Sequence, residues 1–507
     1  MQSVTDPTPF PPCPTPFNMA AHVLARAQDQ PDKVAVAVVS ENSVERLSYA
    51  DLEAAVRGTG AGFLQAGCVP GDRILLRLGN TIDFPIAYLA ALGVGLVPIP
   101  TSAGLSVPEV GQIVAQMQPR IIVRDPDVSS APGPPQLGLA TLRAMRQMPR
   151  APWHMGDPER LGYVVYTSGT SGAPRAVGHA HRAIWARKMM HQGWYALRED
   201  DVLMHAGAFN WTYTLGTGLM DPWSVGAAAL IPAPGTPPEA LGALLAQHKG
   251  TLFAAAPGVY RQMLTRGRLP TLPGLRHGLS AGEKLPDATR TAWMSATGTP
   301  IHEAYGLSEC STFISSSPDA PCPPDALGRP QPGRRVAIVG PDGPVPTGTK
   351  GIIGIHNSDP GLMLGYLGHP DDTRAKFQGD WFLTGDLGCM SSDGHVYYLG
   401  RNDDQMNAGG HRVSPIEVEA AVSSAPGVIA VGAAEVQIKP GVRIIVAFYT
   451  SAAPLDEPAL QAYVDAQLAT YKRPRAYIRI DQMPTGPNGK ILRRRLHLFW
   501  PKPTKAH

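Results

Sequence analysis

The sequence predicts an α/β protein: a large N-terminal domain of mixed sheets and helices with a β-rich subdomain, followed by a small α+β C-terminal domain. Between Val34 and about Tyr398, short apolar runs typical of buried strands alternate with helical patterns, as largely parallel sheets require. The chain has 507 residues, which is more than one ordinary hydrophobic core accommodates. A polar stretch near Arg401 then precedes a second region with its own strands and helices.

The expected elements of the first region are apolar runs with helices between several of them. The proline-rich stretch 316–332 predicts a loop on the way to the β-rich region. The expected strands are 73–78, 120–123, 201–205, 227–232, 251–256 and 335–339, and the expected helices include Val259–Arg266 and Pro286–Ala296.

The second region begins with punctuating polar residues, 402–405. Ser414 predicts a helix N-cap, with Pro415 at the first helical position and Glu417 closing a capping box. Strands at 428–436, 443–449 and 476–480 and a helix at 458–470 complete a small α+β unit. We therefore predict an N-terminal domain of residues 1–400 and a C-terminal domain of residues 405–507, with residues 401–404 between them.

Composition excludes several classes of function. The net charge is only +3, which does not favour a nucleic-acid or membrane-surface partner. The proline-rich residues 1–17 do not resemble a signal peptide, and the apolar stretch 84–100 is broken by glycine and proline, which predicts a buried helix running into a strand. The five cysteines are scattered, without metal or disulfide spacing, so we expect a cytoplasmic protein with reduced thiols.

The segment Tyr166–Arg175 alternates glycines with hydroxyl residues and ends in a cation. Such a loop offers backbone N–H groups, hydroxyls and a positive charge to a polyphosphate. An apolar run, 161–166, precedes it and a helical pattern, 181–190, follows it, which is the element order of a nucleotide site. The glycine spacing is not that of a Walker A loop, and taken alone the segment is equally compatible with a flexible surface loop.

Three further features are each weak evidence for a nucleotide site when taken alone. Glu309 ends the stretch 301–309 and could hold Mg²⁺ beside phosphates, while Tyr305 could stack on a base; an ordinary strand end is the plainer interpretation. Asp386 follows an apolar run in what reads as a turn, where its carboxylate could accept hydrogen bonds from ribose hydroxyls. Lys490 lies in the loop 484–490 near the C-terminus, where a lone lysine is usually solvated surface.

In this order and spacing, the pieces from about Phe17 to Arg495 resemble the adenylate-forming superfamily of acyl-CoA synthetases, peptide adenylation domains and luciferases. The resemblance implies a two-step reaction. ATP and a carboxylate give an acyl-adenylate and pyrophosphate, and a thiol then displaces AMP. It implies ATP, Mg²⁺ and coenzyme A as cofactors and a small-molecule carboxylic acid as substrate.

The resemblance also implies roles for individual residues. Lys490, Glu309 and Arg175 match catalytic positions, and Glu309 is the implied Mg²⁺ ligand. The resemblance implies a hinge at 401–404, with Asp403 at the hinge position, about which a mobile C-terminal domain (405–507) rotates. Gly409, Gly410 and Arg412 match the loop that lines the pantetheine tunnel. The implied ATP and AMP contacts are Thr167, Ser168, Gly169, Thr170, Ser171, Gly172, Gly282, Glu283, Tyr305, Gly306, Ser308, Asp386 and Arg401.

One departure stands out. The phosphate loop of the family usually ends in Pro-Lys, and here it ends in Pro174-Arg175. The charge is kept while reach and hydrogen-bond geometry change, so we expect activity to survive. Ser171 and Ser308 stand where threonine is more usual and keep the hydroxyl.

The segment 208–218 is rich in aromatic residues, which favours a compact, flat acyl pocket. Phe209 or Trp211 would gate it, Asn210 could bind a ring substituent or pack against backbone, and Ala281 and Gly282 would line it. This pattern is most similar to benzoate- and aminobenzoate-type CoA ligases. A short- or medium-chain fatty acyl-CoA synthetase, a stand-alone adenylation enzyme that loads a carrier protein, and an inactive nucleotide-binding homologue are the alternatives.

Overall fold

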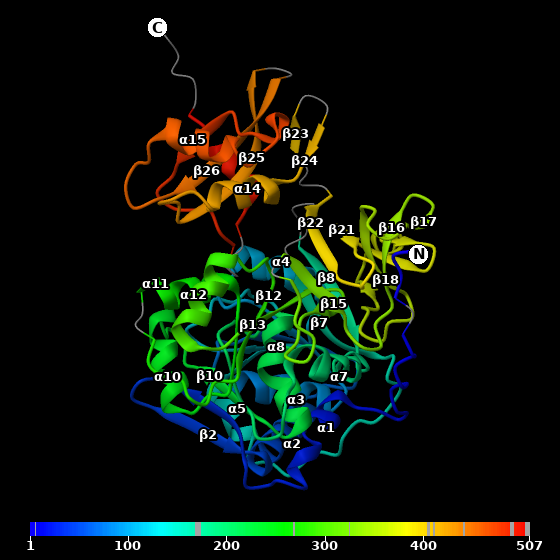
Figure 1. Cartoon of the computed structure of the whole chain (residues 1–507). Helices are drawn as coiled ribbons and strands as arrows, with labels where there is room; N and C mark the ends of the chain where they lie inside the picture. The colour runs from blue at the N-terminus through cyan, green and yellow to red at the C-terminus, as the bar shows by residue number, and fades with distance from the viewer. Residues whose placement is uncertain are drawn as a thin grey trace. The chain divides into compact units, whose positions relative to one another are not determined.

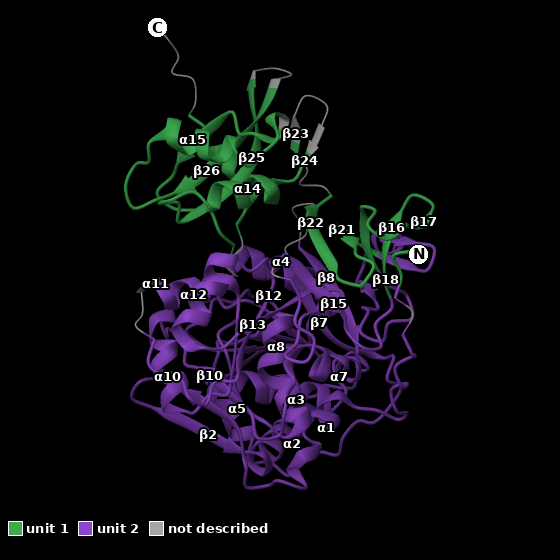
Figure 2. Cartoon of the chain, viewed as in Figure 1, with its two compact units in different colours: residues 1–4, 336–354, 383–507 green, residues 5–335, 355–382 purple. Residues whose placement is uncertain are grey.

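The computed structural model describes the whole chain except residues 6, 168–173, 267–268, 324, 403–405, 409–410, 440–441, 487–490 and 502–507. The chain forms two compact units, shown in different colours in Figure 2. Unit 1 comprises residues 1–4, 336–354 and 383–507, and unit 2 comprises residues 5–335 and 355–382. The limits of the N-terminal domain, hinge and C-terminal domain inferred from the sequence stay a prediction.

A long sheet forms the centre of unit 2. Its strand order is β15-β14-β13-β12-β11-β9-β10-β1-β2, and the strands from β13 to β1 pair in parallel. The remaining strands at both ends pair antiparallel. These strands are β1 (Val34–Val39), β2 (Val44–Ser48), β9 (Val202–His205), β10 (Ala228–Pro232), β11 (Leu252–Ala255), β12 (His277–Ala281), β13 (Ile301–Leu307), β14 (Ser311–Ser315) and β15 (Ala326–Pro330).

Two smaller sheets complete unit 2. The first has the order β4-β3-β5-β6 and is parallel throughout; it consists of β3 (Arg73–Arg77), β4 (Val97–Pro100), β5 (Ile121–Arg124) and β6 (Gln136–Gly138). The second is antiparallel and has the order β19-β8-β7; it consists of β7 (Leu161–Thr167), β8 (Arg175–Ala180) and β19 (Gly365–Tyr366). The short β20 (Phe377–Gln378) pairs with the start of β21 (Trp381–Met390).

The helices of unit 2 flank these sheets (Figure 1). Phe253 of β11 contacts Tyr260 and Trp293 of the covering helices, and all three rings are buried. The helices are α1 (Met19–Val23), α2 (Tyr49–Gln65), α3 (Asp83–Gly93), α4 (Val107–Met117), α5 (Leu139–Met145), α6 (Ala183–Ala186), α7 (Lys188–Met190), α8 (Thr212–Leu215), α9 (Asp221–Val225), α10 (Leu241–Gln247), α11 (Pro257–Arg266), α12 (Asp287–Thr297) and α13 (Pro370–Arg374).

The phosphate-loop segment corrects one expectation. The strand β7 is followed by a second strand, β8, which pairs antiparallel with it, and helix α6 begins only at Ala183. The order is therefore strand, loop, strand, and not strand, loop, helix. Ala176 and Val177, the apolar residues after the loop, are fully buried in this hairpin. A short apolar run of this kind is compatible with a buried strand as well as with a buried helix.

Unit 1 contains an antiparallel part and a C-terminal part. In the first, the order is β17-β16-β18-β21-β22, and in the second β25-β26-β27 forms a sheet beside the hairpin β23–β24. Buried residues of α14, α15 and the sheet form one core. The elements not yet given are β16 (Val336–Gly340), β17 (Gly343–Pro344), β18 (Gly351–His356), β22 (Val396–Arg401), β23 (Met406–Ala408), β24 (His411–Val413), β25 (Ala430–Lys439), β26 (Val442–Thr450), β27 (Ala476–Arg479), α14 (Pro415–Ser423), α15 (Glu457–Asp465) and α16 (Arg493–Leu496).

The predicted helix start at Ser414 is confirmed, but the predicted capping box is absent from this helix. Ser414 is the N-cap of α14 and Pro415 is the first helical residue, yet the Ser414 side chain makes no cap hydrogen bond. Its hydroxyl donates instead to the Leu399 carbonyl at 2.8 Å, and Glu417 pairs with Lys472. Tertiary partners thus replaced the local bonds that the sequence pattern predicts.

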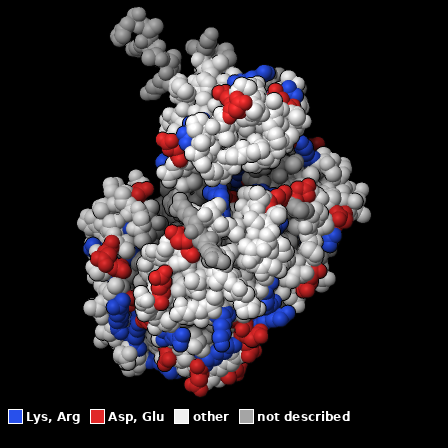
Figure 3. Space-filling view, turned by 60° about the vertical axis from the view of Figure 1, so that its left-hand side comes forward, with Lys and Arg blue, Asp and Glu red and all other residues white. Residues whose placement is uncertain are grey.

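Two expectations from composition agree with the structure: a buried helix running into a strand, and free thiols. The apolar stretch 84–100 forms most of α3, a turn and β4, with α3 buried all round. No helix in the described part of the chain is long and apolar enough to cross a membrane. The five cysteines are free thiols. On the face shown in Figure 3, acidic and basic side chains alternate, in keeping with the small net charge.

Candidate active site

The stems of the phosphate loop are well placed to hold it. Thr167 ends β7 and Arg175 begins β8, and the two residues are paired across the hairpin. The side chain of Arg175 is part-buried and pairs with Asp372, and its guanidinium lies 5.4 Å from the ring centre of Tyr366. The loop residues Ser168, Gly169, Thr170, Ser171 and Gly172 lie outside the described residues, so their role stays a prediction.

Glu309 occupies the turn between β13 and β14. The hairpin is tight at Gly306, where an added Cβ would lie 2.1 Å from the Ser311 carbonyl oxygen, so only glycine fits. The Ser308 carbonyl oxygen contacts the Nε2 of buried His179 at 2.7 Å, and this contact holds the turn in place. The Tyr366 hydroxyl donates a 2.6 Å hydrogen bond to the Oε1 of Glu309. The part-buried Tyr305 packs edge-on against Phe313 on the same hairpin.

A carboxylate in this turn fits a magnesium ion that arrives with nucleotide. Mg²⁺ is commonly held by one or two carboxylates plus phosphate oxygens, not by a complete protein cage. The described residues contain no cluster of three or more histidine, cysteine or acidic side chains that could hold a metal alone. The Tyr366 hydroxyl occupies one oxygen of the Glu309 carboxylate, Oε1. Glu309 is thus available as a single Mg²⁺ ligand.

Gly282 follows the C-terminal end of β12 with a φ of +99°. A Cβ there would lie 2.7 Å from Cζ2 of Trp211, because the indole packs directly over this glycine. Ala281 is buried in the same cluster as Trp211 and Tyr213. Glu283 is part-buried next to Lys284, which donates to the Asp325 carbonyl at 3.1 Å. The structure therefore brings Trp211, Ala281 and Gly282 together as one wall.

Gly282→Ala should damage acid binding without unfolding the protein. The methyl group would strain the backbone at positive φ and push the indole of Trp211 aside, so we expect kcat/KM for the acid to fall about 10- to 100-fold. Steady-state kinetics with acid and ATP varied separately measures this. Gly298→Ala is the matched control, since Gly298 has a φ of +72° and no atom within 4 Å of the added Cβ. Equal losses in both variants would contradict the assigned contact.

The second carboxylate of the predicted site, that of Asp386, lies in unit 1. Asp386 lies within strand β21 and not in a turn, which corrects the sequence interpretation. It is paired in register with Arg401 on β22, and the Arg401 Nη1 is 3.2 Å from the Asp386 Oδ1. The Thr384 hydroxyl lies 3.1 Å from the Asp386 amide, and Asp386 is buried. A buried carboxylate fixed by an arginine is suited to accept hydrogen bonds from a diol.

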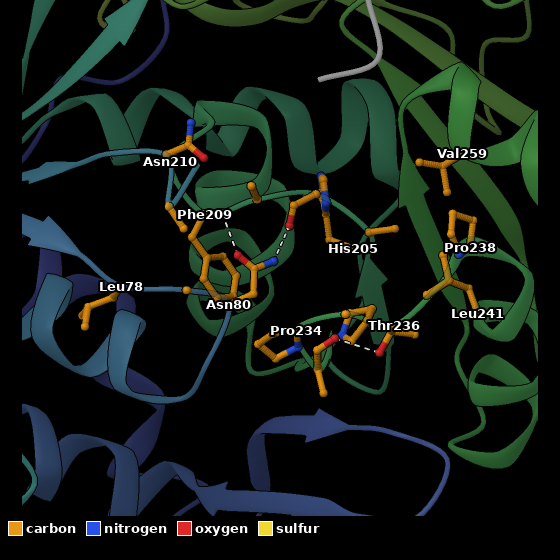
Figure 4. A pocket seen from close by; sticks show the side chains of 18 of the residues that line it. Leu78, Asn80, His205, Phe209, Asn210, Pro234, Thr236, Pro238, Leu241 and Val259 are labelled. Carbon is orange, nitrogen blue, oxygen red and sulfur yellow. Dashed lines mark hydrogen bonds between the residues drawn. The ribbon is translucent and has the colours of Figure 1, made fainter. Parts of the chain in front are cut away.

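A cleft of ≈ 370 Å³ opens in unit 2 where strands β3, β9 and β10 end (Figure 4). Phe209 and Asn210 from the acyl-pocket segment line it, together with Asn80 and His205. The Asn80 amide donates to the Gly207 carbonyl at 2.7 Å, and its oxygen accepts from the Phe209 amide at 3.2 Å. Asn80 thus holds the 207–209 backbone. Sequence reasoning missed it because its partners lie more than a hundred residues away in the chain.

His205 is the second residue that sequence reasoning missed. It is 4% exposed, lies at the C-terminal end of β9 and packs edge-on against Tyr213 at 4.4 Å. Burial lowers its pKa to about 3, so the imidazole is neutral. Neither ring nitrogen has a hydrogen-bond partner within the described part of the structure. A buried, neutral donor and acceptor beside a cleft is available to a polar ligand group.

Several implied site residues cannot be placed. Lys490, Asp403, Gly409 and Gly410 lie outside the described residues. Arg412 lies in strand β24, paired with Asn407, and only its backbone is described. The roles of these residues in adenylation, hinge motion and coenzyme A binding stay predictions.

Comparison with known proteins defines the class. The family model "AMP-binding enzyme" matches residues 23–367, and "AMP-binding enzyme C-terminal domain" matches residues 417–490. The chain therefore belongs to the AMP-binding enzyme family. The mixed α/β fold, with a large N-terminal and a small C-terminal domain, and the resemblance to adenylate-forming enzymes are thereby confirmed.

Individual relatives point to aryl-CoA ligases. The chain is 28% identical to a 3-hydroxybenzoate–CoA ligase of Aromatoleum sp. (strain CIB) over 89% of this chain and 91% of the relative. It is 29% identical to a benzoate–CoA ligase of Thauera aromatica over 85% and 86% of the two chains. The solved benzoate CoA ligase of Burkholderia xenovorans LB400 superposes with a TM-score of 0.84 at 26% identity, covering 95% of this chain and all of the other.

Proposed function

We propose that the acid activated by this AMP-forming acid–CoA ligase is a small aromatic, benzoate-like acid. The reaction joins acid and coenzyme A at the expense of ATP, through an acyl-adenylate, and releases pyrophosphate and AMP. The relatives named above act on benzoate and 3-hydroxybenzoate according to their names, which supports the same class of acid here.

The contact of Trp211 with Gly282 carries the proposal. A large flat ring lies against a residue without a side chain, and Tyr213 stands edge-on to that ring at 5.1 Å. Across the same segment, Phe209 is buried and tilts against Phe84 at 5.0 Å. Rigid aromatic walls suit a flat ring and leave little space for a long flexible chain.

The proposed roles in the first step are electrostatic. Attack of the carboxylate on the α-phosphorus builds negative charge on phosphate oxygens, and fixed donors and cations stabilise it. Arg175 supplies a cation at the end of the phosphate loop, and Lys490 supplies the second. Glu309 would hold Mg²⁺, which would supply positive charge to neutralise the phosphates. Asp386 and Arg401 bind the ribose hydroxyls.

A panel of acids in a pyrophosphate-release assay tests the proposed acid. With ATP, Mg²⁺ and coenzyme A present, we expect kcat/KM for benzoate, aminobenzoates and hydroxybenzoates to exceed that for octanoate and butyrate at least 10-fold. Loss of one or two methylene contacts in a pocket gives discrimination of this size. Cyclohexanecarboxylate is the matched control for ring shape without aromaticity. A preference for the aliphatic acids would contradict the proposal.

A second assay identifies the thiol. We expect AMP release to depend on free coenzyme A and to proceed without any carrier protein, because the relatives are named as CoA ligases. AMP release that required a phosphopantetheinylated carrier domain would overturn coenzyme A as the acceptor and leave the adenylation step intact.

A further inference from the structure

A short segment of unit 2 links the cation of the phosphate loop to the magnesium carboxylate. The Tyr366 hydroxyl donates to the Glu309 Oε1 at 2.6 Å, and the face of the same ring lies 5.4 Å from the guanidinium of Arg175. Arg175 in turn forms an ion pair with Asp372, six residues beyond Tyr366. One phenol therefore contacts two of the charged residues that the proposed mechanism assigns to phosphate chemistry, Arg175 and Glu309.

The backbone around this phenol is fixed from two sides. Tyr366 pairs with Val177 of β8, and the Leu367 amide donates to the Ala176 carbonyl at 2.9 Å. The Tyr366 amide donates to the Thr373 hydroxyl at 2.9 Å. Tyr366 is 5% exposed, so its ring has little freedom to move. Both Tyr366 and Arg175 are thus anchored to the strand that leaves the phosphate loop.

A fixed donor restricts the carboxylate that accepts from it. Glu309 stands in a turn, where its side chain would otherwise sample several rotamers at a cost when it binds a ligand. The phenol holds one carboxylate oxygen, and a metal needs only the other. Burial, and then the neighbouring Glu309, raise the pKa of Tyr366 far above neutrality, so the hydroxyl keeps its proton.

The same geometry accounts for arginine at position 175. A guanidinium is planar and can pair with a carboxylate at its edge while its face lies on an aromatic ring. A lysine ammonium on a flexible stem is a point charge and does not provide both contacts in one fixed arrangement. The half-buried Asp372 supplies the edge contact and Tyr366 supplies the ring.

We propose that Tyr366 is a positioning residue for the magnesium carboxylate Glu309, and that the Arg175–Asp372 pair holds the Tyr366 ring in place for that role. The proposal rests on the proposed function, since it requires Glu309 to bind Mg²⁺ with ATP. It assigns no chemical step to Tyr366, which orients the carboxylate and does not touch the reacting atoms.

Tyr366→Phe in the full-length protein tests the proposal, because it removes the hydroxyl and keeps the ring. Binding of Mn²⁺, as a probe for Mg²⁺, is measured by electron paramagnetic resonance with a non-hydrolysable ATP analogue present. We expect the Kd for Mn²⁺ to rise about 10-fold, as for loss of other partners that orient a metal ligand. Thioester formation from supplied acyl-adenylate should be unchanged. A drop in adenylation with unchanged Mn²⁺ affinity would overturn the positioning role.

A double-mutant cycle separates positioning from damage to the fold. Glu309→Gln removes the ligand, so adding Tyr366→Phe to it should weaken Mn²⁺ binding no further. Additive losses would mean that Tyr366 acts elsewhere and would sink the proposal. Tyr463→Phe is the control: its hydroxyl donates to the Ser424 carbonyl in unit 1, and we expect wild-type Mn²⁺ affinity.

Arg175→Lys and Asp372→Asn test the second half of the proposal. Each should raise the Kd for Mn²⁺ by a smaller factor than Tyr366→Phe, about 2- to 5-fold, because the hydroxyl remains and only the ring is released. Wild-type affinity in both variants would overturn the role of this pair. Absence of acid-dependent pyrophosphate release by the wild-type enzyme would instead refute the proposed function, and the Mn²⁺ measurements distinguish the two failures.

Discussion

Lys490→Ala should lower the rate of acyl-adenylate formation about 10²- to 10³-fold, the loss that follows removal of one preorganised charge-stabilising group. The ammonium is expected to stabilise negative charge as the carboxylate attacks the α-phosphorus, and alanine offers nothing in its place. Formation of the thioester involves no such charge on phosphate. The rate of thioester formation from supplied acyl-adenylate should therefore stay at the wild-type level.

Single-turnover measurements of the two half-reactions check this prediction. Acid-dependent pyrophosphate release reports the first step, and coenzyme A-dependent AMP release from a prepared acyl-adenylate reports the second. Lys350→Ala is the matched control, because Lys350 is an exposed lysine of the same unit and should leave both rates unchanged. Equal losses in the two steps would show that Lys490 maintains the fold or the domain, and not the adenylation chemistry.

Asp221→Asn should cost about 3–5 kcal/mol of stability, the usual effect of leaving a buried charge without its counter-ion. The side chains of Arg187 and Asp221 are almost fully buried, at 6% and 0% exposure. The guanidinium donates to both carboxylate oxygens, at 2.8 and 2.6 Å, and the Tyr195 hydroxyl donates to one of them at 2.8 Å. Asparagine keeps the shape of the side chain and removes the charge that the arginine requires.

Urea-induced unfolding of the wild type and variant measures the difference. Asp371→Asn is the matched control, since Asp371 and Arg374 form an ion pair whose side chains are 88% and 71% exposed, and pairs of this kind contribute about 0–1 kcal/mol. Similar losses in the two variants would contradict the assigned importance of burial.

The same pair predicts a pH dependence. Burial alone would raise the pKa of Asp221, but the adjacent Arg187 outweighs it and holds that pKa well below the usual value of about 3.9. A carboxyl whose pKa is lower in the folded state contributes its stability above its unfolded pKa. The contribution is lost as pH falls through the folded pKa. The stability advantage of the wild type over Asp221→Asn should therefore begin to fall below about pH 4 and decrease further as pH approaches the folded pKa.

Much of the fold could be predicted from local patterns. The apolar runs at 201–205, 227–232 and 251–256 became β9, β10 and β11, because a continuous apolar run has to be buried on both faces of a parallel sheet. Pro415 started a helix, as a residue without an amide hydrogen does at the first helical position. These signals depend on neighbours in sequence, and a single chain displays them.

The failures share one physical cause. The segment after the phosphate loop became strand β8 because it pairs with β7 and β19, and no local pattern reveals those partners. Asp386 lies in a strand opposite Arg401 because the register of β21 on β22 places it there. Ser414 bonds to Leu399 instead of its own helix. In each case the free energy of a tertiary contact outweighed a local conformational preference, which is itself small.

Residue types along the chain were enough to predict the chemistry of the proposed site: a hydroxyl- and glycine-rich loop ending in Arg175, the carboxylates Glu309 and Asp386, and an aromatic segment for the acyl group. Residue types and their spacing carry that information, since each side chain's donors, acceptors and charge are fixed by its identity. Only the tertiary structure decided which groups meet. The hydroxyl of Tyr366 reaches Glu309 across 57 residues of sequence, and Asn80 holds the backbone at Gly207, because pairing and packing between distant segments set distances that spacing along the chain does not contain.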